Sequence, residues 1–386
     1  MHAYLTQVDL TEKMEKFMGS NKENFSVAVI ATMSSGKSTT LNAMLGIPLL
    51  PSMNEACTAT VYKIEDIDGL EHFKGRYITR DGSESEWENI NYREDKLTQW
   101  NNSGFESIEI QGDFPHIDNH KSIISFIDTP GPNNSTDKSH SEITHNIIAN
   151  SQYGFVLCIM NASHFGVDDE RILLTNLLED LNKKGQKTKI VFAVNKMDQL
   201  DVEGGESPKG LISNIRKYLN EIGYFNPTVV PIMSLASLEI REIIKAHKSG
   251  VELPFSNRKQ KKILREIECL CEFESHYKDA NITEIQYHEL MKEKKQSSNI
   301  GKYDLVTKLA NFFNTQLGDF LESRRKRQLI TLGGDSITVG KLMQADVITG
   351  IPLLEEMLEI ELLKSYKKDG TPEEKSNITL KEIKSN

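Results

Sequence analysis

The sequence predicts an α/β fold: a doubly wound, mostly parallel sheet with a helical C-terminal extension. The runs "SIISFID", "YGFVLCIM" and "KIVFAVN" are short and almost continuously apolar, which is typical of parallel strands buried on both faces. Segments of helix length lie between these runs, as crossover helices do. A third observation is the loop "ATMSSGKSTT", which follows an apolar strand. A sheet of this kind binds its ligand at the carboxyl ends of its strands.

Composition and charge narrow the class of protein. The chain has 386 residues, of which 38% are hydrophobic and 26% charged, an ordinary globular balance that suits two domains. Its formal net charge of -10 argues against a general attraction to nucleic acid, and we expect no such partner. No apolar stretch reaches roughly 18 residues, so we expect no membrane span. Four cysteines without a C-x-x-C pair suggest reduced thiols. The expected location is cytoplasmic, with peripheral contact at a membrane left open.

The remaining elements follow in chain order. The stretch "TQVDLTEKMEKFMGSNKEN" has apolar residues at helical spacing, which predicts a lead helix within residues 1–21. The segments "ATVYKIEDI" and "HFKGRYI" read as strands and precede a polar insertion at roughly 80–103. The stretch "PTVVPIM" adds one more strand after the three apolar runs.

Beyond Lys245 we expect helices and no further strand. A helical insertion occupies about 250–300, and an amphipathic helix near 302–325 packs against the sheet or the lead helix. Residues 326–386 then form a helical stub with two short helices after a glycine break, followed by a mobile polar tail.

The first loop resembles the phosphate-binding pattern G-x-x-x-x-G-K-[ST]. Gly36, Lys37 and Ser38 fit its end, while Ala31 stands where its first glycine would be. Backbone N–H groups at the helix start would point at the phosphates, Lys37 would reach the β and γ oxygens, and the Ser38 hydroxyl would bind Mg²⁺. The predicted nucleotide contacts in this loop are Ser35, Gly36, Lys37, Ser38 and Thr39. The alternative reading is an accidental turn.

Two further motifs follow strands. In "DTPG", Asp128 would reach the Mg²⁺ shell through water, and the N–H of Gly131 would meet the γ-phosphate. The same letters also form an ordinary turn. In "NKMD", the Asp198 carboxylate would accept hydrogen bonds from N1–H and the 2-amino group of guanine, for which adenine has no counterpart.

The other residues of the base-binding loops have supporting parts. Lys196 would lie over the base, and Asn195 would tie its loop to the phosphate loop. Ser234, after the last strand, would belong to the loop whose backbone N–H groups touch the guanine O6. The alternative for Asn195 and Asp198 is helix capping in a polar turn.

Together, "MSSGKSTTLNAMLGIPLLPSMNEACTATVYKI", "DTPGPN" and "NKMD" resemble the bacterial branch of the dynamin family of large GTPases over roughly residues 22–245. The resemblance implies a GTPase domain at 22–325 that hydrolyses GTP to GDP and phosphate. It implies that Thr58 completes the Mg²⁺ shell, with Thr60 as the alternative, and that Ser34 helps to place a monovalent cation over the phosphates. The residues expected to act in catalysis are thus Ser34, Lys37, Thr58 and Gly131.

Two departures from the family pattern bear on the rate. Met33 stands where dynamin has a glutamine that orients the attacking water, and Pro132 stands where Ras-like GTPases have theirs. Unassisted hydrolysis would then be slow, on the order of 10⁻⁴ per second. We therefore expect nucleotide-dependent pairing of two GTPase heads to complete the site. A second dynamin-like polypeptide or a membrane surface are the other partners considered.

Other readings stay open at this point. About 60 residues follow the predicted closing helix, which is short for a stalk and membrane tip. The basic runs "SRRKRQ" and "NRKQKK" suit either lipid phosphates or a solvated helix end. A nucleotide-binding scaffold with little or no hydrolysis, acting through a partner protein, is the main alternative function. An ATPase of another phosphate-loop family is a third.

Overall fold

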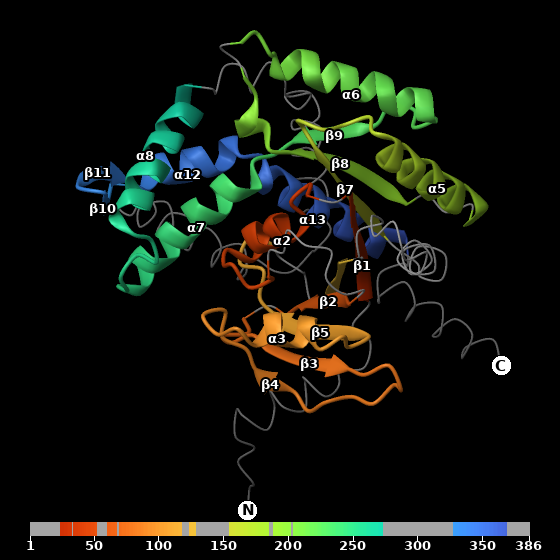
Figure 1. The fold of residues 1–386 in the computed structure, drawn as a ribbon, viewed down its shortest axis with the longest axis horizontal. Coiled ribbons are helices and arrows are strands. Elements are labelled where there is room, and N and C mark those ends of the chain that lie inside the picture. Colours follow the sequence, from red (N-terminus) through yellow and green to blue (C-terminus); the bar gives the residue numbers. More distant parts are fainter. Residues whose placement is uncertain are drawn as a thin grey trace, which may run out of the picture.

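The central feature of the fold is one large sheet with helices over both faces (Figure 1). The computed structural model describes residues 24–32, 34–51, 60–67, 69–117, 123–128, 154–184, 188–201, 204–272 and 327–368. The predicted lead helix at 1–21, the closing helix near 302–325 and the polar tail lie outside these residues. The predicted helical insertion is described only in its first part.

Nine strands form this sheet. Their bounds are β1 Asn24–Ala31, β2 Val61–Asp66, β3 Lys74–Ile78, β4 Glu88–Asn89, β5 Ser107–Gly112, β6 Ile123–Asp128, β7 Phe155–Asn161, β8 Lys189–Asn195 and β9 Thr228–Pro231. They lie in the order β4-β3-β5-β2-β6-β1-β7-β8-β9. Five neighbouring strands, β6, β1, β7, β8 and β9, run parallel to one another. By contrast, β2 is antiparallel to β6, and β3 is antiparallel to β5 and β4. The predicted mostly parallel sheet is confirmed.

The polar ends of the parallel strands lie together. In the register of the sheet, Val29 of β1 lies opposite Asp128 of β6, and Asn161 of β7 lies opposite Asn195 of β8. All seven residues of β7 are buried, in keeping with a strand covered on both faces. The carboxyl edge of the sheet therefore presents a row of polar side chains at the end of a buried apolar block.

Helices cover both faces and one side of the sheet. The helices within the described residues are α2 Lys37–Leu45, α3 Lys96–Asn102, α5 Asp168–Lys184, α6 Pro208–Ile222, α7 Ser234–Ser249, α8 Asn257–Glu272, α12 Val339–Ile348 and α13 Ile351–Lys368, with a 3₁₀ turn, η1, at Met197–Gln199. Alternate residues of β1 divide between two cores: Val27 and Val29 pack with α2 and α13, while Ala28 and Ile30 pack with α5. This alternation is what a doubly wound sheet requires.

The expectation of no strand beyond Lys245 is wrong. A two-stranded antiparallel hairpin, β10 Leu329–Leu332 and β11 Asp335–Thr338, precedes α12. Its turn is Gly333–Gly334, both at positive φ, which is the two-residue connection that hairpins favour. The sequence shows only a glycine break here, because strands of four residues are too short for alternation to distinguish them from a loop. The two helices expected after it are present as α12 and α13.

The C-terminal helices are tied to the helix that follows the phosphate loop. Arg241 of α7, 4% exposed, bonds Asp346 of α12 and both carboxylate oxygens of Glu355 of α13. It also donates to the backbone carbonyl of Ala43 in α2, at 3.0 Å. Ser237 completes the group by donating to Asp346 at 2.5 Å. We call these residues the Arg241 cluster; it joins four helices, α2, α7, α12 and α13.

Candidate functional site

The loop between β1 and α2 has the backbone of an anion-binding turn. Ser34 and Gly36 both have positive φ, +60° and +91°, and Gly36 is the N-cap of α2. Gly36 has no side chain that could cap α2, which is the usual arrangement where a helix N-terminus binds an anion. The Ser35 hydroxyl turns inward and donates to the carbonyl of Thr32 at 2.7 Å. Ser34 is exposed, and Ser38 and Thr39 lie half-buried in the first turn of α2.

Asn195 joins this loop to Ser234, which is the first residue of α7 and not, as the sequence predicts, part of a loop after β9. Its side-chain amide donates to the carbonyl of Ser35 at 2.8 Å and accepts from the N–H of Ser234 at 3.0 Å. A Cβ added to Gly36 would lie 2.3 Å from the Asn195 amide nitrogen. Glycine is therefore required at position 36 for its close approach as well as for its φ.

A second contact, between α2 and α7, has almost no signal in the sequence. The Thr40 hydroxyl lies 2.8 Å from that of Ser234 and donates to the carbonyl of Gly36 at 2.9 Å. Both hydroxyls are buried. The only sequence signal for Thr40 is its position four residues after Gly36, from which a threonine can reach back along a helix.

Lys37 and Asp128 form an ion pair beneath the phosphate loop. The lysine nitrogen lies 2.8 Å from Asp128 Oδ1, and the side chains are 15% and 7% exposed. Burial raises the pKa of Asp128 above its usual range, and the Lys37 charge opposes that rise. The sequence predicted both residues as ligand contacts, and the structure places them against each other.

The Asp128–Ser38 region suits a cation that brings most of its ligands from elsewhere. No group of three or more His, Cys, Asp or Glu side chains gathers at one point among the residues that the structure describes. Mg²⁺ characteristically takes one or two protein oxygens together with substrate phosphates and waters. One buried carboxylate, paired with Lys37, and the hydroxyl of the next residue, Ser38, at a helix N-terminus fit that donor set.

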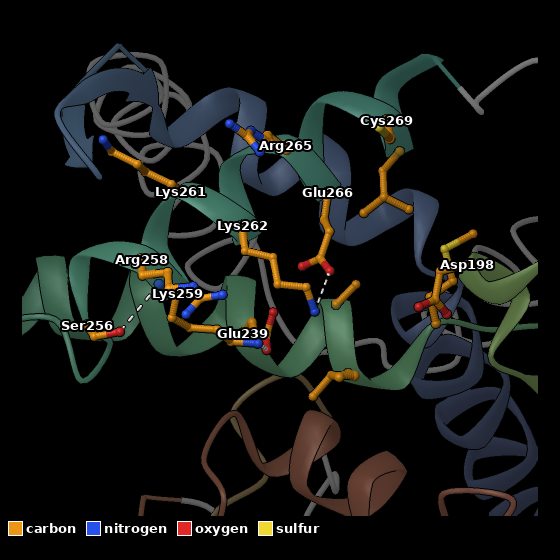
Figure 2. A pocket seen from close by; sticks show the side chains of 14 residues that line it. Asp198, Glu239, Ser256, Arg258, Lys259, Lys261, Lys262, Arg265, Glu266 and Cys269 are labelled. Carbon is orange, nitrogen blue, oxygen red and sulfur yellow. Dashed lines mark hydrogen bonds and ion pairs between the residues drawn. The ribbon is translucent and has the colours of Figure 1, made fainter.

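Asp198 lies in η1, at one end of a cavity of about 810 Å³ between α7 and α8 (Figure 2). Leu235 and Ala236, in the first turn of α7, line the same cavity. Burial raises the pKa of Asp198, Glu266 raises it further, and Lys196 and Lys262 lower it. Lys196 itself has a positive φ of +67°, which turns the chain between β8 and η1.

Helix α8 forms the far wall of this cavity. Its basic residues are in part neutralised: Lys262 pairs with Glu266 at 3.0 Å, and Lys259 pairs with Glu239 of α7. The sequence indicates only a lipid-binding or solvated run for "NRKQKK". Its place in the wall of the cavity that Asp198 also lines has no sequence signal, because this cavity arises from the tertiary packing of two helices.

Several predicted residues lie outside the described part of the chain. These are Thr58 and Gly131, with Met33 and Pro132 beside the expected position of the attacking water. Thr60, the alternative metal ligand, is described. Its hydroxyl donates to the carbonyl of Phe105 at 3.1 Å. Phe105 precedes β5, which flanks β2 on the side away from β6 and Asp128.

Two comparisons with known proteins find similarity to dynamins. Residues 27–197 match the model of the Dynamin family. Dynamin-like protein A of Bacillus subtilis (strain 168) is 28% identical over 181 residues, which are 46% of this chain and 14% of that protein. No helix within the described residues is both long and apolar enough to cross a bilayer.

Solved structures give weaker likenesses. A chain of "An oligomerised bacterial dynamin pair provides a mechanism for the long-range sensing and tethering of membranes" aligns with a TM-score of 0.41 and 17% identity, over 82% of this chain and 50% of that one. Aquifex aeolicus Era bound to GDP and AlF4⁻ aligns with a TM-score of 0.32 and 18% identity, over 61% of this chain and 58% of that one. At these TM-scores the function has to be argued from the site's own residues.

Proposed function

Because this chain belongs, through residues 27–197, to the dynamin family of GTPases, we propose that it binds GTP at the carboxyl ends of β1, β6 and β8 and hydrolyses it to GDP and phosphate. One observation carries the proposal. The Asn195 side chain bonds the phosphate loop at Ser35 and the start of α7 at Ser234. The loop suited to phosphates is thereby held against the segment Asn195–Asp198, which is suited to a base, and a nucleotide site needs both parts in a fixed relation.

At the phosphate end, the N–H groups at the start of α2 hold the phosphates. Lys37 exchanges its bond to Asp128 for the β and γ oxygens, since one ammonium group can serve either set of anions. Ser38 and, through water, Asp128 would hold Mg²⁺, which would neutralise part of the charge of the phosphates. Thr58 and Gly131 complete the γ-phosphate contacts, and Ser34 assists with a monovalent cation.

At the base end, the carboxylate of Asp198 accepts two hydrogen bonds from guanine while Lys196 covers the ring. Asp198 must be ionised to accept both bonds. The raised pKa of Asp198 therefore predicts that guanine affinity weakens on acidification earlier than for an ordinary carboxylate. Adenine would leave this buried carboxylate without its donors, which disfavours ATP by a large factor.

The reaction is the in-line attack of water on the γ-phosphate. Met33 and Pro132 provide no side chain that could orient that water. We infer that a second GTPase head, pairing in a nucleotide-dependent way, supplies what is missing and accelerates turnover by about 10³-fold or more.

Phosphate release from GTP and from ATP, with Mg²⁺ and K⁺ and over a wide range of protein concentration, tests the proposal. We expect turnover of GTP alone, with a rate per molecule that steepens with concentration. Lys37→Ala serves as the inactive control, and Lys63→Ala, which removes a lysine from a surface pair on β2, serves as the matched active control.

Two other outcomes would redirect the assignment. Tight binding of GDP without GTP turnover at any concentration would favour the scaffold, for which Ala31, Met33 and Pro132 are the supporting residues. Equal affinity for GDP and ADP would count against the base-reading role of Asp198 and favour the ATPase. A rate per molecule that stays flat with concentration would exclude activation by pairing.

A further inference from the structure

Tyr62 lies beside the predicted phosphate site without belonging to any of its motifs. It stands on β2, directly opposite Asp128 of β6 in the antiparallel register. Residues opposite each other in such a pair extend to the same face of the sheet, with Cβ atoms about 4.5–5.5 Å apart. That face is the one that α2 covers, since Tyr62 shares a core with Leu41 and Met44 of this helix.

The phenol group of Tyr62 is buried but unused. Its side chain is 7% exposed, and its hydroxyl has no hydrogen-bond partner among the residues that the structure describes. Burial, and then the negative charge of Asp128, raise the pKa of this phenol, so the hydroxyl keeps its proton at neutral pH. A buried donor without an acceptor lowers stability, and few native hydroxyls are left in this condition.

A tyrosine elsewhere in the chain shows the usual arrangement. The Tyr224 hydroxyl, also buried, donates to the carbonyl of Leu174 at 2.7 Å. The difference indicates that Tyr62 meets its acceptor in a state other than the one with Lys37 bound to Asp128.

The movement of Lys37 would create that acceptor. When Lys37 turns to the phosphates, the buried Asp128 carboxylate loses the cation that lies 2.8 Å from it. The Mg²⁺ that Asp128 would reach through water would still leave one oxygen of this buried carboxylate without a donor, and a buried carboxylate is unfavourable unless both of its oxygens are bonded. We propose that the Tyr62 hydroxyl is this donor: it bonds Asp128 when Lys37 leaves, and so holds the carboxylate in place in the nucleotide-bound protein.

Tyr62 is in this sense a positioning residue, acting through Asp128. The inference rests on the proposed function, because a ligand has to draw Lys37 away. Its distinctive consequence is that the hydroxyl contributes to nucleotide affinity and contributes nothing, or an unfavourable amount, to the stability of the nucleotide-free fold.

Tyr62→Phe in the full chain tests the inference, because it removes only the oxygen. A fluorescent GDP analogue with Mg²⁺ gives the dissociation constant, and thermal melting without nucleotide gives the stability. We expect the dissociation constant to rise about tenfold, as for a lost hydrogen bond to a charged group. We expect the melting temperature of the nucleotide-free protein to stay unchanged or rise.

Tyr224→Phe is the matched control and should behave in the opposite way. It removes a buried hydroxyl that has a partner, far along the chain from the phosphate loop, so it should lower the melting temperature and leave GDP affinity unchanged. Tyr62→Phe in an Asp128→Asn background provides a further readout. The effect on affinity should largely disappear there, since the charged acceptor is gone.

The outcomes separate the inference from the function on which it rests. Equal GDP affinity of wild type and Tyr62→Phe would overturn the inference alone, as would a loss of affinity matched by an equal loss of nucleotide-free stability. An undiminished effect of Tyr62→Phe in the Asp128→Asn background would also overturn it. A wild type that binds no guanine nucleotide would overturn both the inference and the proposed function.

Discussion

The Lys37–Asp128 pair and the Arg241 cluster both place charges in the interior of this molecule, but they differ in how fully those charges are satisfied. Arg241 uses its guanidinium on Asp346, on both oxygens of Glu355 and on the carbonyl of Ala43. Lys37 makes a single ion pair with one oxygen of Asp128. The rigid guanidinium of Arg241 can satisfy its three acceptor groups in one geometry only. The flexible ammonium group of Lys37 has one acceptor and can exchange it for another.

This difference indicates that the Arg241 cluster stabilises the fold, the frame of the molecule, whereas the Lys37–Asp128 pair is the working part that takes part in ligand binding. The Arg241 cluster joins α2, α7, α12 and α13, so its loss would affect how the helix after the phosphate loop is held. The Lys37–Asp128 pair lies where the proposed ligand binds, and a ligand can replace either partner. We therefore expect variants of the first to lose stability and variants of the second to lose binding.

Arg241→Ala should have the largest effect. It would leave Asp346 and Glu355 buried without their cation, and breaking a buried pair in this way costs about 3–5 kcal/mol of unfolding free energy. Urea denaturation of the nucleotide-free protein measures it. Arg258→Ala, which removes an exposed arginine of α8, is the control and should change stability by less than about 0.5 kcal/mol. Similar stabilities for the two variants would show that the cluster does not fix the frame.

Lys37→Met should give the reverse pattern. We expect GDP and GTP affinity to fall by about 100-fold, equivalent to roughly 2.7 kcal/mol, because charge-assisted bonds to the phosphates are lost. The loss of unfolding free energy should be smaller than for Arg241→Ala, since Asp128 can take up a proton in place of its partner. Titration with a fluorescent nucleotide and denaturation by urea measure the two effects. A variant that is strongly destabilised but binds normally would contradict the assignment of this pair as the working part.

The same contrast explains what the sequence could and could not predict. Lys37, Asp128 and Asn195 each follow a short apolar strand, and parallel strands bring their carboxyl ends to one edge, so local patterns were enough to place them together. The loop of Lys37 also carries Gly36, whose φ of +91° and contact with Asn195 only glycine accommodates.

The Arg241 cluster had no such signal. Arg241 and Ala43 are 198 positions apart, and Arg241 reads in the sequence as one more charge on an amphipathic helix. Which charged residue of a helix is buried depends on the elements that pack against it, here α12 and α13. Two other features could not be predicted for the same reason: the cavity wall that α8 forms near Asp198, and the contact between Thr40 and Ser234. Both join parts of the chain that are far apart in the sequence.

The Thr40–Ser234 contact allows a finer test of the frame near the site. Thr40→Val and Ser234→Ala should each cost about 1 kcal/mol of unfolding free energy, and the double variant should cost clearly less than their sum because the two hydroxyls share one bond. Urea denaturation of the three variants gives the coupling. Thr175→Val is the matched control: it removes a hydroxyl that also donates four residues back along a helix, but at an exposed position. Strict additivity would mean that α2 and α7 are not coupled through this bond.

Glu170 extends the comparison to a buried carboxyl that has no cation beside it among the described residues. It is 1% exposed, and its Oε1 accepts the N–H of Gly166 at 2.8 Å, while Oε2 has no hydrogen-bond partner in that part of the chain. Burial raises the pKa of Glu170 from 4.5 to about 7, against a small lowering by the Gly166 N–H. Among the described residues no lysine or arginine offsets a negative charge on Glu170, so this carboxyl group binds a proton at a higher pH than an exposed glutamate does.

The titration of Glu170 should be detectable in the pH dependence of the unfolding free energy, and its effect should be the smallest of the four effects predicted for these variants. Between pH 4.5 and about 7 the folded protein holds a proton that the unfolded chain has released. The contribution of Glu170 to the unfolding free energy therefore falls as pH rises through that window and is constant above it, by about 1 kcal/mol after allowance for structural relaxation. Glu170→Gln keeps the acceptor for Gly166 and removes the titration, so its stability should decline less over this range than that of the wild type. Glu179→Gln, on the exposed side of the same helix, should follow the wild type. Parallel curves for wild type and Glu170→Gln would mean that water or a cation reaches this carboxyl, and that charge in this interior is compensated even where the fold supplies no basic side chain.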